Sequence, residues 1–64
     1  MDAITYLESL NRLITVEEFA EFTGISAKTL YRRIHAHRLP AIRDKGLIRL
    51  EPHAAAAWLR SRLS

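Results

Sequence analysis

Residues 18–34 read EFAEFTGISAKTLYRRI, and their spacing is the strongest structural signal in the chain. Two helices that cross at a sharp angle need a small residue at their contact and a glycine in the tight turn between them. Ala20 and Gly24 meet these two needs. The apolar residues that can anchor the second helix on the first follow the glycine, at Ile25, Leu30 and Ile34. The spacing therefore predicts a helix-turn-helix over residues 15–37.

Capping signals support the same two helices. Residues 15–18, TVEE, read as a capping box, in which the Thr15 hydroxyl accepts from the amide of Glu18 and the Glu18 carboxylate reaches back. Gly24 is expected to end the first helix in the left-handed conformation that glycine adopts at little cost. Ser26 is the expected N-cap of the second helix.

The flanking segments predict two more helices and a hairpin. Residues 1–11 have apolar residues at helical spacing after a possible N-cap at Asp2. Residues 41–50 change to strand-like alternation around an Asp-Lys-Gly turn, which predicts a β-hairpin. Residues 52–63 start with proline and are rich in alanine, which predicts a closing helix. The expected fold is one mainly α domain over residues 1–64: a winged helix-turn-helix with a short two-stranded wing and an extra N-terminal helix.

Length and composition limit the class of protein. The chain has 64 residues, no cysteine and an apolar fraction of 48%. One small domain with marginal stability is expected, without disulfides or a thiolate zinc site. No apolar run approaches the roughly 20 residues of a membrane span, and the N-terminus lacks a basic secretory signal. We therefore expect no membrane contact and a cytoplasmic location in a bacterial host, associated with the nucleoid.

Charge is distributed unevenly along the chain. Residues 1–25 carry one basic residue against five acidic ones, a net charge of −4. Residues 26–50 carry seven basic residues against one acidic residue, a net charge of +6. The asymmetry gives the domain one acidic and one strongly basic part, and a polyanion is the natural partner of the basic part.

The order of these motifs resembles a known family. The chain is similar to the excisionase family in five features: RLITVEEFAEFTGIS from Arg12, TLYRRI from Thr29, LPA from Leu39, the hairpin and a closing Trp58-Leu59 helix. These are small winged helix-turn-helix proteins related to the MerR-type DNA-binding domain. The family includes phage excisionases (recombination directionality factors), AlpA-like prophage regulators and parts of some terminase small subunits. The resemblance covers residues 12–63 and implies binding to double-stranded DNA.

The resemblance also implies which residues contact DNA. Residues 26–33 would form the recognition helix in the major groove, and residues 43–49 would form the wing on the phosphates or in the adjacent minor groove. Taken with the basic residues nearby, the candidate DNA-binding residues are Ser26, Lys28, Thr29, Tyr31, Arg32, Arg33, His35, Arg38, Arg43, Lys45 and Arg49. The chain departs from the family at His37, where glycine is common. His37 is expected either to take a positive φ or to lie in a slightly longer helix.

The segment before Arg12 is extra relative to the minimal family domain. It could pack on the core or contact another protein. Tyr31 could contact the DNA backbone or lie at the edge of the core. The aromatic and aliphatic residues Phe19, Phe22, Ile34, Trp58 and Leu59 are expected in the core.

Nothing in the sequence predicts catalysis, a metal site or a cofactor. His35 and His37 are two residues apart, so they would not share a helical face, and no third ligand is near. Glu17, Glu18 and Glu21 are expected to act as capping and solvated charges. No serine has the histidine and acid that a nucleophile needs. We therefore expect a protein that is not an enzyme.

Three functions compete at this point. The first is a phage excisionase, which binds several DNA sites beside an attachment site, bends the DNA and directs an integrase towards excision, with cooperative self-association on DNA. Its support is the small size, which leaves no room for an effector domain. The second is an AlpA-like prophage transcriptional regulator. The third is a protein-interaction module that works through the acidic N-terminal helix, which deletion of residues 1–11 would test.

Overall fold

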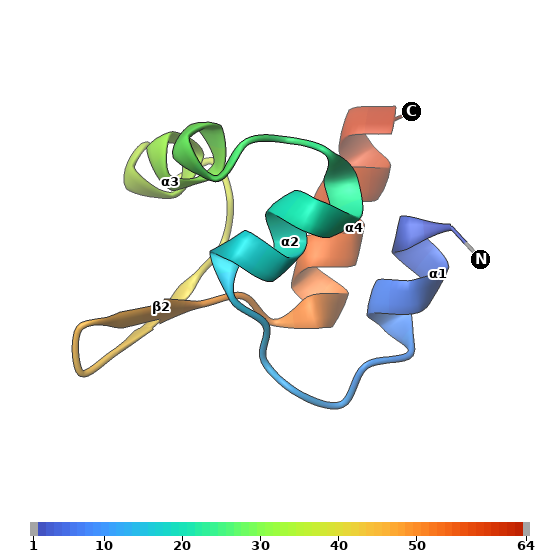
Figure 1. Ribbon diagram of the computed structural model, residues 1–64, viewed down its shortest axis with the longest axis horizontal. Helices are drawn as coiled ribbons and strands as arrows, with labels where there is room; N and C mark the ends of the chain where they lie inside the picture. The colour runs from blue at the N-terminus through green and yellow to red at the C-terminus, as the bar shows by residue number, and fades with distance from the viewer. Residues whose placement is uncertain (1, 64) are drawn as a thin grey trace.

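The computed structural model describes residues 2–63, which form four helices and one two-stranded antiparallel sheet (Figure 1). The elements in chain order are α1 (Ala3–Glu8), α2 (Val16–Thr23), α3 (Ala27–His35), β1 (Ile42–Asp44), β2 (Leu47–Arg49) and α4 (Pro52–Leu63). This is the mainly helical winged helix-turn-helix that the sequence predicts, with its additional N-terminal helix. Residues 1 and 64, at the ends of the predicted domain, lie outside the described residues.

The helix-turn-helix is held by the capping signals read from the sequence. The Glu18 amide donates to Thr15 Oγ1 at 3.0 Å, and the Thr15 amide donates to Glu18 Oε1 at 3.0 Å. Gly24 has a φ of 77°, so the turn uses the left-handed conformation that favours glycine. The Ser26 hydroxyl accepts from the amide of Thr29 at 3.2 Å and caps α3. The predictions of the capping box, the glycine turn and the second cap are confirmed.

One hydrophobic core joins all the helices and the base of the wing. The largest fully buried side chains are those of Phe19, Leu7, Ile14, Leu30, Leu50 and Val16. The two anchors predicted for the inner face of α3, Leu30 and Ile34, are buried, whereas Ile25 is half-buried. Leu59 and Phe19 are buried as predicted, but Phe22 and Trp58 lie half-buried at the edge of the core.

The N-terminal helix is shorter than residues 1–11 and belongs to the core. It ends at Glu8, where the Ser9 hydroxyl donates to the carbonyl of Tyr6 and competes with further helical bonding. Leu7 is fully buried, and α1 packs against α4. An ion pair of 2.9 Å joins Glu8 to Arg60 of α4. Of the two roles left open for this segment, packing on the core is the one observed.

The wing is a tight hairpin. Asp44 pairs with Leu47, so the loop has two residues, Lys45 and Gly46. Their φ angles of 52° and 81° are both positive, which is the pattern of a type I′ turn. Asp44, predicted as part of the turn, is the last residue of β1 instead. A further bridge between Ile14 and Leu50 ties the base of the hairpin to the segment before α2.

The elements separate into two sides. In Figure 1, α3 and the hairpin lie on one side of the molecule, and α1 and α4 lie on the other, with α2 between them. The +6 segment, residues 26–50, thus occupies one side of the domain. Within residues 2–63, no helix is long and apolar enough to cross a membrane.

Candidate nucleic-acid interface

The outer face of α3 carries a stripe of exposed, basic side chains. Leu30 and Ile34 hold the inner face in the core. Because an α-helix has about 3.6 residues per turn, Arg32 projects directly away from them. Lys28 and His35 lie four residues before and three residues after Arg32, so they share its face, and all three side chains are exposed. This stripe is the part of α3 that a major groove could receive.

The two hydroxyl residues at the start of α3 bond to each other. Ser26 Oγ donates to Thr29 Oγ1 at 2.9 Å while it caps the helix. Ser26 is exposed and Thr29 is half-buried. Because the N-terminus of a helix favours anions, the exposed Ser26 hydroxyl lies where a DNA phosphate would be stabilised.

The C-terminal end of α3 borders a shallow hollow with three guanidinium groups around it. The hollow is lined by Thr29, Arg32, Arg33, Ala36 and Arg38. Arg33 is half-buried, and its buried Nε has no hydrogen-bond partner among the described residues. Arg38 is exposed and lies beyond the helix, on the connection to the wing, as predicted. Three arginines around one hollow can neutralise a phosphate there.

Tyr31 lies at the edge of the core and its hydroxyl is already engaged. The hydroxyl donates to Glu17 Oε2 of α2 at 2.9 Å. The hydrogen bond to the Glu17 carboxylate and partial burial raise the pKa of Tyr31 above its usual value, whereas the nearby charge of Arg49 lowers it. Of the two roles considered for Tyr31, the core edge is what the structure shows. A phosphate would have to compete with Glu17 for this hydroxyl.

The three basic residues of the wing differ in how exposed their side chains are to solvent. Lys45 is exposed in the turn at the end of the hairpin, and Arg43 is exposed on β1. Arg49 is half-buried on β2, and its Nη1 donates to the carbonyl of Ile48 at 2.9 Å. Arg43 and Lys45 are therefore better placed than Arg49 to reach phosphates.

A direct contact joins the wing to α3. Arg43 Nη2 lies 3.4 Å from Nδ1 of His35. The contact joins the basic stripe of α3 to Arg43 of β1. In Figure 1, α3 and the hairpin lie on the same side of the molecule, so the exposed basic side chains of the +6 segment come from a helix and a hairpin that share one side.

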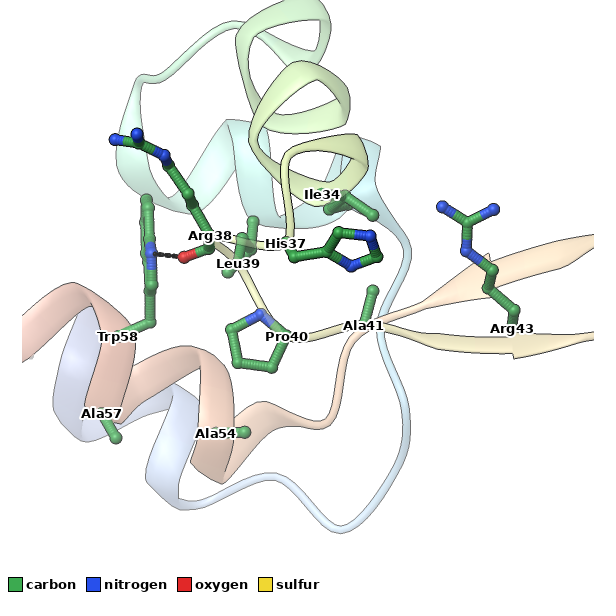
Figure 2. A pocket seen from close by; sticks show the side chains of 10 residues that line it. All are labelled: Ile34, His37, Arg38, Leu39, Pro40, Ala41, Arg43, Ala54, Ala57 and Trp58. Carbon is green, nitrogen blue, oxygen red and sulfur yellow. Dashed lines mark hydrogen bonds between the residues drawn. The ribbon is translucent and has the colours of Figure 1, made fainter.

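The turn between α3 and the wing is fixed by α4. His37 has a φ of 59°, so the first of the two expectations for this residue, a positive φ, is confirmed. The Trp58 indole Nε1 donates to the carbonyl of Arg38 at 2.8 Å, as the dashed line in Figure 2 shows. The guanidinium of Arg62 lies 5.0 Å from the centre of the Trp58 ring. The contact of Trp58 with the Arg38 carbonyl therefore holds the connection between α3 and the wing against α4.

Two residues that shape this surface were predicted for other roles. Glu17 was expected to be a solvated charge near a cap, but it holds the Tyr31 hydroxyl fourteen residues away. Such a separation has no helical or strand periodicity, so no sequence pattern would find it. Trp58 was predicted as core, and the one available signal was that a partly buried indole N–H needs an acceptor.

Titratable side chains do not converge on a metal site in the described part of the chain. No three histidine, cysteine or acidic residues gather there in a way that could hold an ion. His35 contacts Arg43, and His53 Nε2 lies 3.0 Å from the carbonyl of Glu8. His35 and His53 therefore take part in separate contacts between elements.

Comparison with known proteins agrees with this geometry. A family model described as a helix-turn-helix domain matches residues 13–63. The match begins after α1 and covers the two helices of the motif, the hairpin and α4. No curated protein and no solved structure matches the chain significantly.

Proposed function

Because the chain belongs to this helix-turn-helix domain family, we propose that it binds double-stranded DNA with α3 in the major groove and the wing beside it. The observation that carries the proposal is that the basic stripe of α3 is joined to the wing by the contact of His35 with Arg43. Arginine can fork onto guanine in the major groove, and lysine or arginine can neutralise phosphate anywhere along the duplex.

The role that we propose for this binding is that of a phage excisionase. Such a protein is architectural and carries out no catalysis. It binds sites beside an attachment site, bends the DNA and helps an integrase to assemble the excision complex. Bending a site costs a few kcal/mol, which phosphate contacts from two separate elements can offset. The proposal is supported by the helix-and-wing surface and by the family, which includes excisionase-like and AlpA-like proteins.

Cooperative self-association on DNA belongs to the same proposal, because one domain of this size offers few contacts. The protein would act in the cytoplasm of a bacterial host, on the nucleoid. A role as an AlpA-like transcriptional regulator would use the same surface. It differs in the location of the binding sites and in having no effect on recombination.

A role centred on the N-terminal helix has weaker support. Leu7 is fully buried and Glu8 is paired with Arg60, so α1 is part of the fold. Deleting residues 1–11 would remove core side chains and could not separate a lost partner from a lost fold. Substitution of exposed residues of α1, such as Thr5, is the better test of that role.

An in vitro recombination assay tests the excisionase proposal. The integrase encoded beside this protein would be incubated with left and right attachment sites, with and without the full chain. Excision that depends on the wild-type chain and is lost in an Arg32→Ala variant is the expected result. A footprint confined to a promoter, with no effect on excision, would contradict the proposal and favour a transcriptional regulator.

A further inference from the structure

The wing carries two exposed apolar side chains, one of which lies at its tip. Leu47 is 55% exposed and Ile42 is 41% exposed, although both lie in strands of the hairpin. If the hairpin had only a structural role, its apolar side chains would be expected to face the core. The other large apolar residues exposed to this degree lie outside the wing, at Tyr6, Leu13 and Leu63.

The pairing of the strands explains why these two residues lack cover. Ile42 pairs with Arg49, and Asp44 pairs with Leu47. Because successive side chains alternate between the faces of a strand, Ile42 and Leu47 share one face. The opposite face carries Ile48, which is half-buried and packs against the core. The hairpin therefore attaches to the domain through the face of Ile48 and leaves Ile42 and Leu47 exposed on the other face, which they share with Asp44 and the half-buried Arg49.

Leu47 also lies at the far end of the hairpin. It directly follows the two-residue turn of Lys45 and Gly46. Each strand has three residues, and at about 3.3 Å per residue the turn stands roughly 10 Å from the base of the hairpin. A side chain at this position can enter a groove that the body of the domain cannot reach.

The charges around this apolar tip are mostly positive. Lys45 lies in the turn, Arg43 lies on the neighbouring strand, and Arg49 lies two residues after Leu47. The acidic residue of the hairpin is Asp44, which pairs with Leu47. An apolar side chain bordered by cations fits an occupant with a polyanionic rim and an apolar interior. The minor groove offers both at a base step that opens, because phosphates border the groove and the space between two stacked base pairs is apolar.

We propose that Leu47 is a wedge that enters the minor groove beside the site contacted by α3 and partly separates two stacked base pairs. Apolar side chains inserted in this way unstack a base step and kink the duplex towards the major groove. Pyrimidine–purine steps unstack most easily, so the wedge would favour such a step at a fixed distance from the bases read by α3. Leu47 would then determine specificity and bending without a hydrogen bond to any base. This inference rests on the proposed DNA binding.

The test uses a duplex site enriched from a randomised pool by the wild-type chain. Energy transfer between dyes at the two ends measures the bend, and 2-aminopurine at successive steps beside the site reports unstacking. The variants are Leu47→Ala and Leu47→Thr, the second of which introduces a β-branched residue that favours a strand. The matched control is Leu63→Ala, which truncates a leucine that is 72% exposed at the end of α4.

The expected result is a loss of both signals in the two Leu47 variants. Their bend should fall by at least about 20°, the lower end of the range for wedge-induced kinks. The 2-aminopurine signal at one step should disappear, and the preference for a pyrimidine–purine step there should be lost. The Leu63→Ala variant should behave like the wild type, and circular dichroism should show all variants folded.

Three results would overturn the inference. An unchanged bend and an unchanged 2-aminopurine signal in the Leu47 variants would mean that the side chain is not a wedge. A normal bend with reduced cooperativity between adjacent sites would assign Leu47 to contacts between protein copies. Failure of the wild-type chain to enrich any duplex would refute the proposed DNA binding itself, and this outcome is distinct from the other two.

Discussion

Replacement of His37 by glycine should stabilise the protein. His37 follows α3 as the residue in the left-handed conformation, with a φ of 59°. Its amide donates to the carbonyl of Ile34 at 3.0 Å, and the amide of Arg38 donates to the carbonyl of Arg33 at 2.9 Å. These two bonds form a Schellman motif, in which glycine is the usual residue at the left-handed position. The backbone at residue 37 is thus already in the geometry that glycine prefers.

The size of the effect follows from two opposing terms. The left-handed conformation costs an L-residue about 1–2 kcal/mol, a cost that glycine does not carry. Glycine in turn loses about 0.5–1 kcal/mol more conformational entropy on folding. The net expectation is a gain of about 0.5–1 kcal/mol in the free energy of unfolding. For a domain of this size, that gain would raise the melting temperature by roughly 2–8 °C.

Urea titration and thermal melting followed by circular dichroism would measure the change. His37→Ala is the control, because alanine removes the imidazole but keeps the strain at Cβ. It should give no gain in stability. A melting temperature that falls in His37→Gly, or rises equally in both variants, would refute the reasoning from backbone strain.

The remaining predictions concern the core, the interface and acid stability. Leu7→Ala should lower the free energy of unfolding by about 2–5 kcal/mol in urea titration, because Leu7 is fully buried; a much smaller loss would mean that α1 unfolds independently of the core. Arg32→Ala should weaken binding to the selected site by about 1–3 kcal/mol if Arg32 contacts a base edge, and fluorescence anisotropy showing unchanged affinity would exclude that role. Lys45→Ala should reduce the salt slope of binding by about one at unchanged sequence preference; a lost preference would show that the turn reads bases. Hydrogen bonds from Arg12 and from the Thr15 amide lower the pKa of Glu18 from 4.5 to about 2, so the stability that the carboxylate adds above pH 4.5 should be lost as the pH falls towards 2. Because Arg12→Met removes one of these hydrogen-bond donors, the variant should lose less stability than the wild type in acid titrations of unfolding. An equal loss in both proteins would contradict the role given to Arg12.

Much of the candidate interface could be predicted because its determinants are local. A helix presents residues four apart on one face, so Lys28 and Arg32 could be placed on the surface opposite Leu30 and Ile34 before any coordinates were known. Whether each side chain is exposed or already bonded to another residue could not be predicted in this way. Arg49 is half-buried and Tyr31 is bonded to Glu17, because both lie where separate elements meet. Their contacts depend on how α2, α3 and the hairpin pack together.

The local structure of this protein follows from short-range signals in its sequence. Thr15, Gly24 and Ser26 specify where helices begin and end, because capping bonds and left-handed turns involve residues only a few positions apart. The relations between distant segments depend instead on how the helices and the hairpin pack together. The bridge between Ile14 and Leu50, the packing of α1 on α4 and the bond from Trp58 to the Arg38 carbonyl all join residues that no short-range pattern connects. These contacts fix how α1, the wing and the end of α3 are held against the rest of the domain, and burial of one shared core is what brings them together.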